Sequence, residues 1–455
     1  MRLRCPSCGR IYSSLIPPKC SCGEPLDVTY DYESINTSRW GRREKGVWRY
    51  RELLPDVHEI ISLHEGGTPL LHARFGDNLG LNVFIKDETR NPTGSFRDRL
   101  ITVAVSYGLP HARNGFVVAS NGNAAASLAA YAARAGREAY TIVPKLIEGS
   151  KLAQIVAFGA KVIRYGESVD EGISYAEGLA EGRDLYNVTP ESNIVGLEGQ
   201  KTIAFELWEE LNPTHVVVPT GSGSNLYSIY KGFNELLRIG VIEEIPKLIA
   251  VQAERCSPIA SEVLGVEPKA KPTRALALYV KDPFMKGLAV KAVEESGGTA
   301  VLVGEDELDL GEKLLAGEGV FAEYASSVVV PALMELADSG YFERDDRIAL
   351  IVTSCGLKGM GAEGRERFTV GGTKLDILRL LSERSMYGYE IWEALEKALK
   401  YQAVYQHLRE LESLGFIAES RREGRRVYYR LTERGRRFLE AFSLQRKGFK
   451  ASLKS

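Results

Sequence analysis

The sequence predicts an α/β protein whose central part is a doubly wound parallel sheet. Between residues 82 and 354, short β-branched apolar runs alternate with stretches of helical spacing. Strands of this kind, separated by helices, form parallel sheets that are covered on both faces. Four cysteines precede this part of the chain and a basic segment follows it. The predicted strands are 83–85, 115–118, 140–143, 162–163, 216–218, 248–251 and 348–352.

Composition and charge narrow the class of protein. The chain has 455 residues, of which 44% are hydrophobic and 26% charged, and this excludes wholesale disorder and a fibrous class. Its net charge of −2 conceals an asymmetry, because residues 371–455 hold 18 Lys and Arg against 11 Asp and Glu. An acidic body beside a basic C-terminal part indicates a second function that faces a polyanion. With no export signal and no apolar run of about 18 residues, we expect a cytoplasmic protein that does not enter a membrane.

The N-terminal cysteines form two knuckles, each followed by glycine. They are Cys5 with Cys8, and Cys20 with Cys22. Four converging thiolates are what a tetrahedral structural zinc requires, and they leave no open position for chemistry. The second pair is irregular, since one residue separates its cysteines instead of two. We therefore expect a structural zinc ribbon in residues 1–45, with a metal-free remnant or reactive redox thiols as alternatives.

Three small, polar, glycine-containing turns follow predicted strands, beginning at Ala119, Pro219 and Thr353. Ligands of doubly wound sheets bind beyond the carboxyl ends of the strands, so these turns predict one concave polar site. The turn at 221–224 precedes a helix, and its backbone N–H groups could face a phosphate. The alternative for this turn is a tight strand-to-helix connection that binds nothing.

Six motifs lie at 65–70, 86–88, 91–96, 120–123, 198–202 and 221–225. Their order and spacing resemble those of threonine synthases, which are fold-type II pyridoxal phosphate enzymes. The resemblance covers about residues 1 to 365 and implies a pyridoxal phosphate fold for residues 46–365. It implies that the cofactor phosphate is held by Gly221, Ser222, Gly223, Ser224 and Asn225, that the cofactor ring contacts Asn123 and Thr353, and that a substrate or effector carboxylate faces Ser120, Asn121 and Gly122.

One position breaks this pattern. Where this sequence has Arg97, the threonine synthase motif has the lysine that forms the Schiff base with the cofactor. A guanidinium has a pKa above about 12, so it supplies neither a nucleophilic amine nor a base near neutral pH. It can hold a carboxylate or a phosphate through its planar fork. We therefore name no catalytic residue, assign Arg97 to the effector site, and do not expect Lys86, 11 residues upstream, to replace the lysine.

Three hypotheses follow for the pocket. The first is a catalytically impaired sensor that binds pyridoxal phosphate without a covalent bond, an amino acid or a phosphorylated amino acid. The second is a weakly active or repurposed enzyme that uses non-covalent cofactor, and the third is an empty pocket in a dimerisation scaffold. The competing enzyme activity is the threonine synthase reaction, which converts O-phosphohomoserine to threonine and phosphate. We favour the sensor, because the phosphate and ring-contact motifs are intact while the amine is missing.

The C-terminal part has the pattern of a separate domain. Its closely spaced glycines predict a linker at 366–372. Helical spacing then predicts helices over 374–383, 388–399 and 402–414, and residues 416–431 predict a hairpin with its turn at Glu423-Gly424. A last helix begins after Thr432. The arrangement resembles a winged helix-turn-helix of the PadR-like transcriptional regulators over about residues 373–445, and we assign residues 373–455 to this domain.

The resemblance implies binding to double-stranded DNA. The third helix would enter the major groove, and the wing would contact phosphates or the minor groove. A charged hairpin in a winged helix that binds protein is the alternative, but eight arginines against two acids between 421 and 437 favour DNA. We predict a homodimer that places two winged helices on a two-fold DNA site in response to a small-molecule effector. The predicted DNA contacts are Gln402, Tyr405, Gln406 and Arg409 on the helix, and Arg421, Arg422, Arg425 and Arg426 on the wing.

Overall fold

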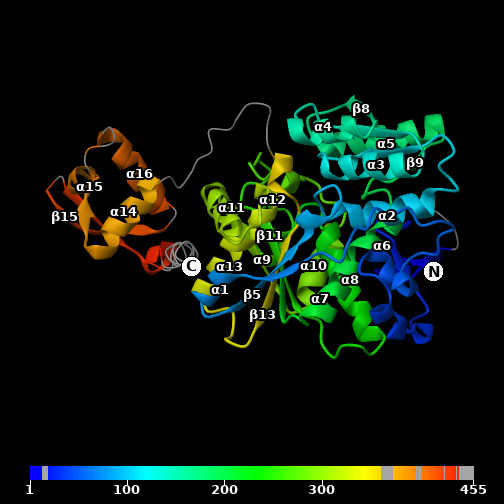
Figure 1. The fold of residues 1–455 in the computed structure, drawn as a ribbon, viewed down its shortest axis with the longest axis horizontal. Coiled ribbons are helices and arrows are strands. Elements are labelled where there is room, and N and C mark those ends of the chain that lie inside the picture. The colour runs from blue at the N-terminus through cyan, green and yellow to red at the C-terminus, as the bar shows by residue number, and fades with distance from the viewer. Residues whose placement is uncertain are drawn as a thin grey trace, which may run out of the picture.

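The chain forms a large α/β body with an N-terminal three-stranded unit, and a smaller C-terminal unit (Figure 1). The computed structural model describes residues 1–12, 19–359, 372–395, 397, 401–413, 415–424, 426–436 and 438–439. Within these ranges no helix has the length and apolar character needed to cross a membrane. The C-terminal unit, drawn in orange and red, lies beside the part of the body that carries α11 and α13 (Figure 1).

The larger sheet of the body has six strands in the order β12-β11-β10-β13-β5-β4, and only the edge strand β4 runs antiparallel to its neighbour. Its central strands are buried on both faces. Val216 and Val218 pack in one hydrophobic cluster with α8 and α10, whereas Val217 packs in the other with α11 and α13. The strands are β4 (Leu70–His72), β5 (Asn82–Asp87), β10 (His215–Pro219), β11 (Lys247–Ala253), β12 (Thr299–Val303) and β13 (Arg347–Val352).

The smaller sheet is parallel throughout and has the order β8-β7-β6-β9. All seven predicted strands are confirmed as strands, but they divide between the two sheets, and β4, β9 and β12 were not predicted. An apolar run identifies a strand without specifying its partners, which accounts for the undivided sheet of the prediction. The strands are β6 (Phe116–Ala119), β7 (Ala139–Val143), β8 (Lys161–Arg164) and β9 (Tyr186–Asn187).

Helices cover both sheets and connect their strands. The three helices that begin at the functional site are α2 (Arg97–Gly108), α3 (Asn123–Arg134) and α8 (Ser224–Arg238). The others in the body are α1 (Arg74–Asp77), α4 (Gly149–Ala157), α5 (Val169–Arg183), α6 (Ile194–Gln200), α7 (Thr202–Glu210), α9 (Ala260–Leu264), α10 (Lys286–Glu295), α11 (Leu308–Gly317), α12 (Tyr324–Ser327) and α13 (Val329–Asp338).

The N-terminal unit is a sheet of β1 (Arg2–Arg4), β2 (Ile11–Tyr12) and β3 (Asp27–Thr29), in the order β2-β1-β3. A buried ion network joins it to the body. The Lys231 ammonium on α8 lies 2.6 Å from the Asp27 carboxylate of β3 and 2.6 Å from the Glu198 carboxylate of α6. Lys201 extends the network, because it pairs with Glu198 at 2.6 Å. The motif at 198–202 therefore anchors the N-terminal unit.

The C-terminal unit has the helix and hairpin order that the sequence predicts. Its elements are α14 (Gly372–Glu383), β14 (Met386–Tyr387), α15 (Gly388–Ala394), α16 (Tyr401–Ser413), β15 (Ile417–Glu423) and β16 (Arg426–Leu431). The prediction of a second helix to residue 399 was wrong at its end, because Lys397 has the left-handed φ of 58° and its N–H bonds back to the Trp392 carbonyl. Residues 433–436 are helical after Thr432, whose hydroxyl accepts from the Gly435 N–H at 3.0 Å. Residues 366–371 of the predicted linker lie outside the described residues.

Candidate functional site

A cavity lies where the polar turns after β6, β10 and β13 meet. It is lined by the predicted effector residues Arg97, Ser120 and Asn121, and by the predicted cofactor residues Asn123, Gly221, Ser222, Gly223, Ser224, Asn225 and Thr353. Gly122 does not line it. This glycine has a φ of 119°, and a Cβ there would lie 2.6 Å from the Lys151 side chain, so Gly122 leaves room for that lysine to pack.

The turn before α8 is shaped to receive an anion. Gly223 has a left-handed φ of 85°, and a Cβ added to it would lie 2.9 Å from the Ala289 side chain. A Cβ on Gly221 would lie 3.1 Å from the Ala277 carbonyl oxygen. In the described structure no side-chain cap bonds the first turn of α8, which leaves its N–H groups and the positive end of the helix dipole facing the cavity. Both glycines are thus required by close packing behind a helix N-terminus that suits phosphate.

Arg97 is the first residue of α2 and reaches across the cavity toward that turn. Its guanidinium carbon lies 4.6 Å from the centroid of the Phe96 ring, and its Nη1 donates a long hydrogen bond of 3.4 Å to the Ser224 hydroxyl. Within the described residues it has no ion-pair partner within 4.0 Å. Burial lowers the pKa of Arg97, and the nearby Glu191 carboxylate opposes that shift.

Two acidic side chains line the cavity that the sequence did not single out. Burial raises the pKa of Glu191, and the charge of Arg97 opposes the rise. Glu323 is compensated locally, since its carboxylate lies 3.2 Å from the Lys151 ammonium. Glu191 follows β9, a strand of only two residues, so no apolar run marked this fourth strand end in the sequence. Glu323 comes directly before α12, a helix of four residues, which also gave no signal.

Buried polar atoms without partners identify where a ligand could bond. Asn123 donates to Glu323 at 3.0 Å and to the Ser354 hydroxyl at 3.2 Å, but its Oδ1 has no partner in the described structure. Both amide atoms of Asn225 are likewise unpartnered. A buried polar group without a partner costs about 1–3 kcal/mol, which ligand atoms could recover. The unpartnered Asn123 oxygen, the glycine turn and the free helix N-terminus fit a phosphorylated ring ligand such as pyridoxal phosphate.

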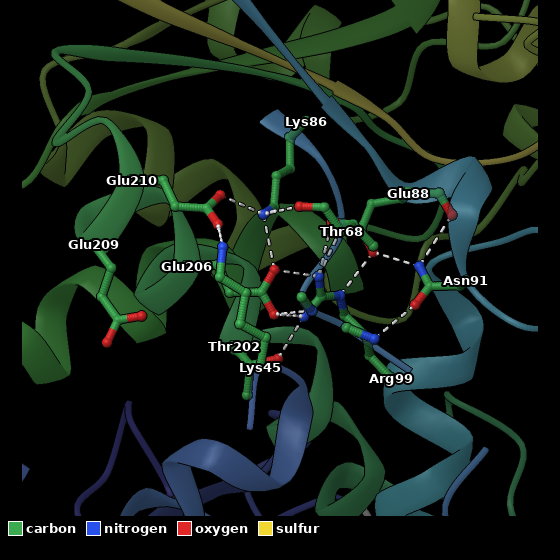
Figure 2. Close-up of polar contacts among 12 residues, drawn as sticks. Lys45, Thr68, Lys86, Glu88, Asn91, Arg99, Thr202, Glu206, Glu209 and Glu210 are labelled. Carbon is green, nitrogen blue, oxygen red and sulfur yellow. Dashed lines mark hydrogen bonds and ion pairs between the residues drawn. The ribbon is translucent and has the colours of Figure 1, made fainter. Parts of the chain in front are cut away.

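The described lysines near the cavity have other partners. Lys86 is fully buried, and its ammonium lies 2.8 Å from the Glu206 carboxylate and 3.0 Å from that of Glu210 (Figure 2). Burial lowers the pKa of Lys358 to about 8, but its ammonium donates to the Thr93 carbonyl and to Gln154, each at 2.8 Å. In the described part of the chain no lysine lines the cavity. Lys86 thus belongs to a buried ion cluster and does not line the cavity.

The four N-terminal cysteines converge. Their sulfur atoms all lie within 4.8 Å of one another, with 3.5 Å between the Cys5 and Cys22 sulfurs and 3.6 Å between those of Cys8 and Cys20. Thiolates about 2.3 Å from one tetrahedral zinc lie roughly 3.8 Å apart, so the arrangement fits such an ion despite the irregular second knuckle. A hydrogen bond from the Tyr12 hydroxyl lowers the pKa of Cys20 to about 6, which favours a thiolate.

We expect the purified protein to contain about one zinc ion per chain, and Cys20→Ser to reduce this close to zero, because a tetrahedral structural site depends on all four thiolates. Elemental analysis of the metal after dialysis measures the content. Cys355→Ser is the matched control, since Cys355 lies in the body, and it should keep the metal. Equal zinc in the two variants would contradict the assignment.

The exposed face of α16 carries most of the polar side chains predicted to contact DNA. Gln402, Gln406 and Arg409 are exposed, whereas Tyr405 is partly buried. The Tyr405 ring packs so closely on α15 that a Cβ on Gly388 would lie 2.5 Å from it, and its hydroxyl bonds to that of Tyr401 at 2.9 Å. Tyr405 thus holds α15 against α16 in addition to any contact with DNA.

The wing carries its arginines on an exposed hairpin. Arg422 pairs with Glu419 at 2.9 Å and Arg421 with Glu423 at 3.2 Å, and both arginine side chains are about three-fifths exposed. The Arg426 guanidinium lies 5.0 Å from the Tyr387 ring centroid. Arg425, also predicted to contact DNA, lies outside the described residues. Exposed ion pairs of this kind are weak, so the arginines can exchange their acidic partners for phosphates.

The geometry defines a class of protein with an α/β body, an anion-accepting pocket between two sheets and a winged-helix unit. The chain belongs to the pyridoxal-phosphate dependent enzyme family, which it matches over residues 61–354, and it carries a C-terminal domain of the transcriptional regulator PadR-like family, matched over residues 377–441. The fold predicted for both parts, fold-type II with a PadR-like domain, is therefore confirmed.

Named relatives agree with this membership. The chain is 39% identical to a threonine synthase of Methanocaldococcus jannaschii over 377 residues, which cover 79% of this chain and 93% of the relative. It is 36% identical to a threonine synthase of Methanosarcina acetivorans, covering 78% and 92% of the two chains. Among solved structures, an L-serine ammonia-lyase of the fungus Rhizomucor miehei matches with a TM-score of 0.56 at 23% identity, over 63% of this chain and 93% of that one. This last likeness concerns the fold alone.

Proposed function

We propose that the protein is a DNA-binding transcriptional regulator whose threonine synthase-like domain is a catalytically impaired sensor. Its ligand is pyridoxal phosphate bound without a covalent bond, an amino acid or a phosphorylated amino acid. The observation that carries the proposal is the cavity itself, which keeps its anion-accepting turn and unpartnered Asn123 and Asn225 atoms but has Arg97 and no lysine in its described lining. Such a pocket can bind but has no amine for covalent catalysis.

One ion pair supports communication between the two units. Arg434, in the helical residues after Thr432, pairs with Glu307 at the end of the 3₁₀ helix η6 (Glu305–Glu307). Glu305 of η6 accepts from the Arg274 N–H at 2.9 Å, and Arg274 donates to the Tyr324 hydroxyl at 2.8 Å. Tyr324 stands between Glu323 and Ala325, both of which line the cavity. A ligand that shifts this wall can therefore favour one placement of the winged helix over another.

We further propose a homodimer that presents two recognition helices to a two-fold DNA site. Winged helices that bind as dimers contact half-sites about one turn of DNA apart, and a symmetric body is the usual means of setting that spacing.

A threonine synthase-type enzyme with an added regulatory domain is the second candidate. The identity of 39% to a named threonine synthase favours it. Such an enzyme requires an amine that bonds the cofactor covalently. The two candidate functions therefore differ in whether a lysine of the purified protein becomes covalently attached to pyridoxal phosphate.

Binding to duplex DNA tests the regulator. We expect binding that weakens steeply with salt, and we expect Arg422→Ala to weaken it on every sequence while reducing the slope of log K against log salt by about 1, because one phosphate contact is lost. Fluorescence anisotropy with labelled duplexes at several salt concentrations measures both effects.

The matched control is Arg379→Ala. Arg379 lies on α14 and pairs with Asp376 at 2.9 Å, the same spacing along the chain and the same length as the Arg422–Glu419 pair. The Arg379→Ala variant should retain the wild-type slope of log K for duplex binding against log salt. A wild-type protein that shows no salt-sensitive binding to any duplex would rule out the regulator.

A further inference from the structure

A second cavity lies between the N-terminal unit and the body. Among the described residues it shares no lining residue with the cavity at the three polar turns. It holds about 460 Å³, which is enough for a small organic molecule. Its walls come from β1, β3 and the 3₁₀ helix η1 (Tyr32–Ser34) on one side, and from α8 and α10 on the other. The N-terminal unit is drawn in dark blue beside α8 in Figure 1.

The floor of the second cavity is the buried ion network that joins the N-terminal unit to the body. Glu235 belongs to this network, because its carboxylate lies 2.7 Å from the Lys201 ammonium. The network has two ammonium groups and three carboxylates, so its net charge is −1 when all are ionised. A buried net charge is costly unless an opposite charge is brought to it. Its members are Lys201, Lys231, Asp27, Glu198 and Glu235, and the last two and both lysines are at most 5% exposed.

The missing positive charge affects Glu235. Burial raises the pKa of Glu235 to about 7, and the charge of Glu198 adds to the rise although Lys201 and Lys231 oppose it. The Glu235 carboxylate accepts from the Tyr32 hydroxyl at 3.2 Å, and both residues line the second cavity. A cation that enters the second cavity would supply the positive charge that the network lacks.

Aromatic rings favour a cation at the same place. Tyr32, Tyr227 and Tyr230 all line the second cavity. The faces of aromatic rings attract ammonium and guanidinium groups, and the Arg238 guanidinium carbon already lies 5.3 Å from the centroid of the Tyr32 ring. Three tyrosines beside a carboxylate of an undercompensated network therefore suit an ammonium group.

The rim of the second cavity carries positive charge. Arg4 at the end of β1 and Arg238 at the end of α8 are both exposed, and neither has an ion-pair partner within 4.0 Å in the described structure. Lys291 also lines the cavity, but it pairs with Glu295 at 3.6 Å. Two unpaired guanidinium groups match two carboxylates, since each planar fork can donate paired hydrogen bonds. The second cavity thus matches one positive charge inside and two negative charges at its rim.

We propose that the second cavity binds an acidic amino acid, with its ammonium group facing Asp27 and Glu235 and its two carboxylates facing Arg4 and Arg238. The ligand joins the two parts of the protein, because Arg4 and Asp27 belong to the N-terminal unit and Glu235 and Arg238 to the body. The assignment goes beyond the proposed sensor and regulator and depends on neither. Helix α8 begins at the first cavity and lines the second, so a ligand in one can alter binding in the other.

Isothermal titration of the full-length protein with L-glutamate tests the proposal. We expect saturable binding of one ligand per chain. Glutarate lacks the ammonium group and L-glutamine lacks the second carboxylate, so each should bind at least about 10-fold more weakly. Absence of saturable L-glutamate binding, or equal affinity for either analogue, would overturn the proposal.

Arg238→Met tests the place of binding. It should weaken L-glutamate binding by about 10-fold, because a charged contact to one carboxylate is lost. Arg134→Met is the matched control and should bind as the wild type does. Arg134 is likewise the exposed last residue of a helix, α3, without an ion-pair partner within 4.0 Å in the described structure, and it lies outside the second cavity. Equal affinities of the two variants for L-glutamate would contradict the proposal.

Glu235→Gln tests the position of the ammonium group. The variant removes the carboxylate charge that the ammonium faces, so the preference for L-glutamate over glutarate should fall by about 10-fold. If Glu235→Gln does not fold, Arg238→Met carries the test, because Arg238 is exposed at a helix end. A folded Glu235→Gln variant that keeps the wild-type preference would show that the ammonium group does not face Glu235 and would overturn the proposal.

Discussion

Arg99→Met is expected to lower the free energy of unfolding of the body by about 3–5 kcal/mol, the loss typical of breaking a buried ion pair. Arg99 is fully buried, and its guanidinium lies 2.7 Å from the Glu88 carboxylate and 2.7 Å from that of Glu206 (Figure 2). Removing it leaves Glu88 buried with the hydroxyl of Thr68 and the amide of Asn91 as its only side-chain donors among the described residues. Glu206 keeps Lys86, so Glu88 accounts for most of the loss.

Urea unfolding followed by circular dichroism measures this loss. Arg164→Met is the matched control, because Arg164 is an exposed arginine on β8 of the same body, and we expect its effect to stay within about 0.5 kcal/mol. If Arg99→Met also changed the free energy of unfolding by no more than about 0.5 kcal/mol, the buried ion pairs of Arg99 would make no net contribution to stability.

The same cluster predicts the sign of a pH effect. Burial raises the pKa of Glu206, but the charges of Arg99 and Lys86 outweigh burial and hold that pKa well below its usual range. A carboxyl with a depressed pKa contributes stability above its unfolded pKa of about 4.3 and loses it as the pH falls. The difference in stability between the wild type and Arg99→Met should therefore narrow below about pH 4.

The buried ion cluster around Arg99 shows what the sequence motifs alone could not predict. The motifs at 65–70, 86–88 and 91–96 identify the threonine synthase resemblance, yet Lys86, Glu88 and Asn91 take part in the buried ion cluster and do not line the cavity. The spacing of motifs shows that a set of residues occurs together in the sequence. It does not show whether those residues form a structural network or a binding site. The polar turns could be placed more directly, because the carboxyl ends of parallel strands converge by geometry.

Residues at short elements gave no signal in the sequence. Glu191 follows a two-residue strand, and the division of the body into two sheets depends on which strands pair, which hydrophobic periodicity does not encode. In the C-terminal unit, the spacing of Val404, Leu408 and Leu411 predicted the buried face of α16. It could not reveal that the Tyr405 ring packs on Gly388, because that contact depends on how α15 crosses α16.

Introducing an amine at position 97 tests directly what distinguishes this pocket from that of a pyridoxal phosphate enzyme. We expect Arg97→Lys to become covalently attached to pyridoxal phosphate, whereas the wild type does not. The cavity retains the glycine turn, the uncapped start of α8 and the unpartnered Asn123 oxygen. A lysine at the N-terminus of α2, partly buried and near a helix dipole, has a lowered pKa and so a larger share of free amine. That amine can condense with the cofactor aldehyde, releasing water.

Borohydride reduction followed by peptide mass analysis measures this attachment and locates it. Arg90→Lys is the matched control, because it adds an amine in the neighbouring turn without placing it in the cavity, and it reports any reaction at exposed lysines. Attachment of pyridoxal phosphate to a specific lysine of the wild-type protein would support the hypothesis that the protein is an enzyme. Failure of Arg97→Lys to attach would mean that restoring the amine is not sufficient for a covalent bond and that other side chains of the cavity also prevent it. Attachment of pyridoxal phosphate to the Arg97→Lys variant and not to the wild type would establish that the Arg97 guanidinium is what keeps this pocket from bonding the cofactor covalently.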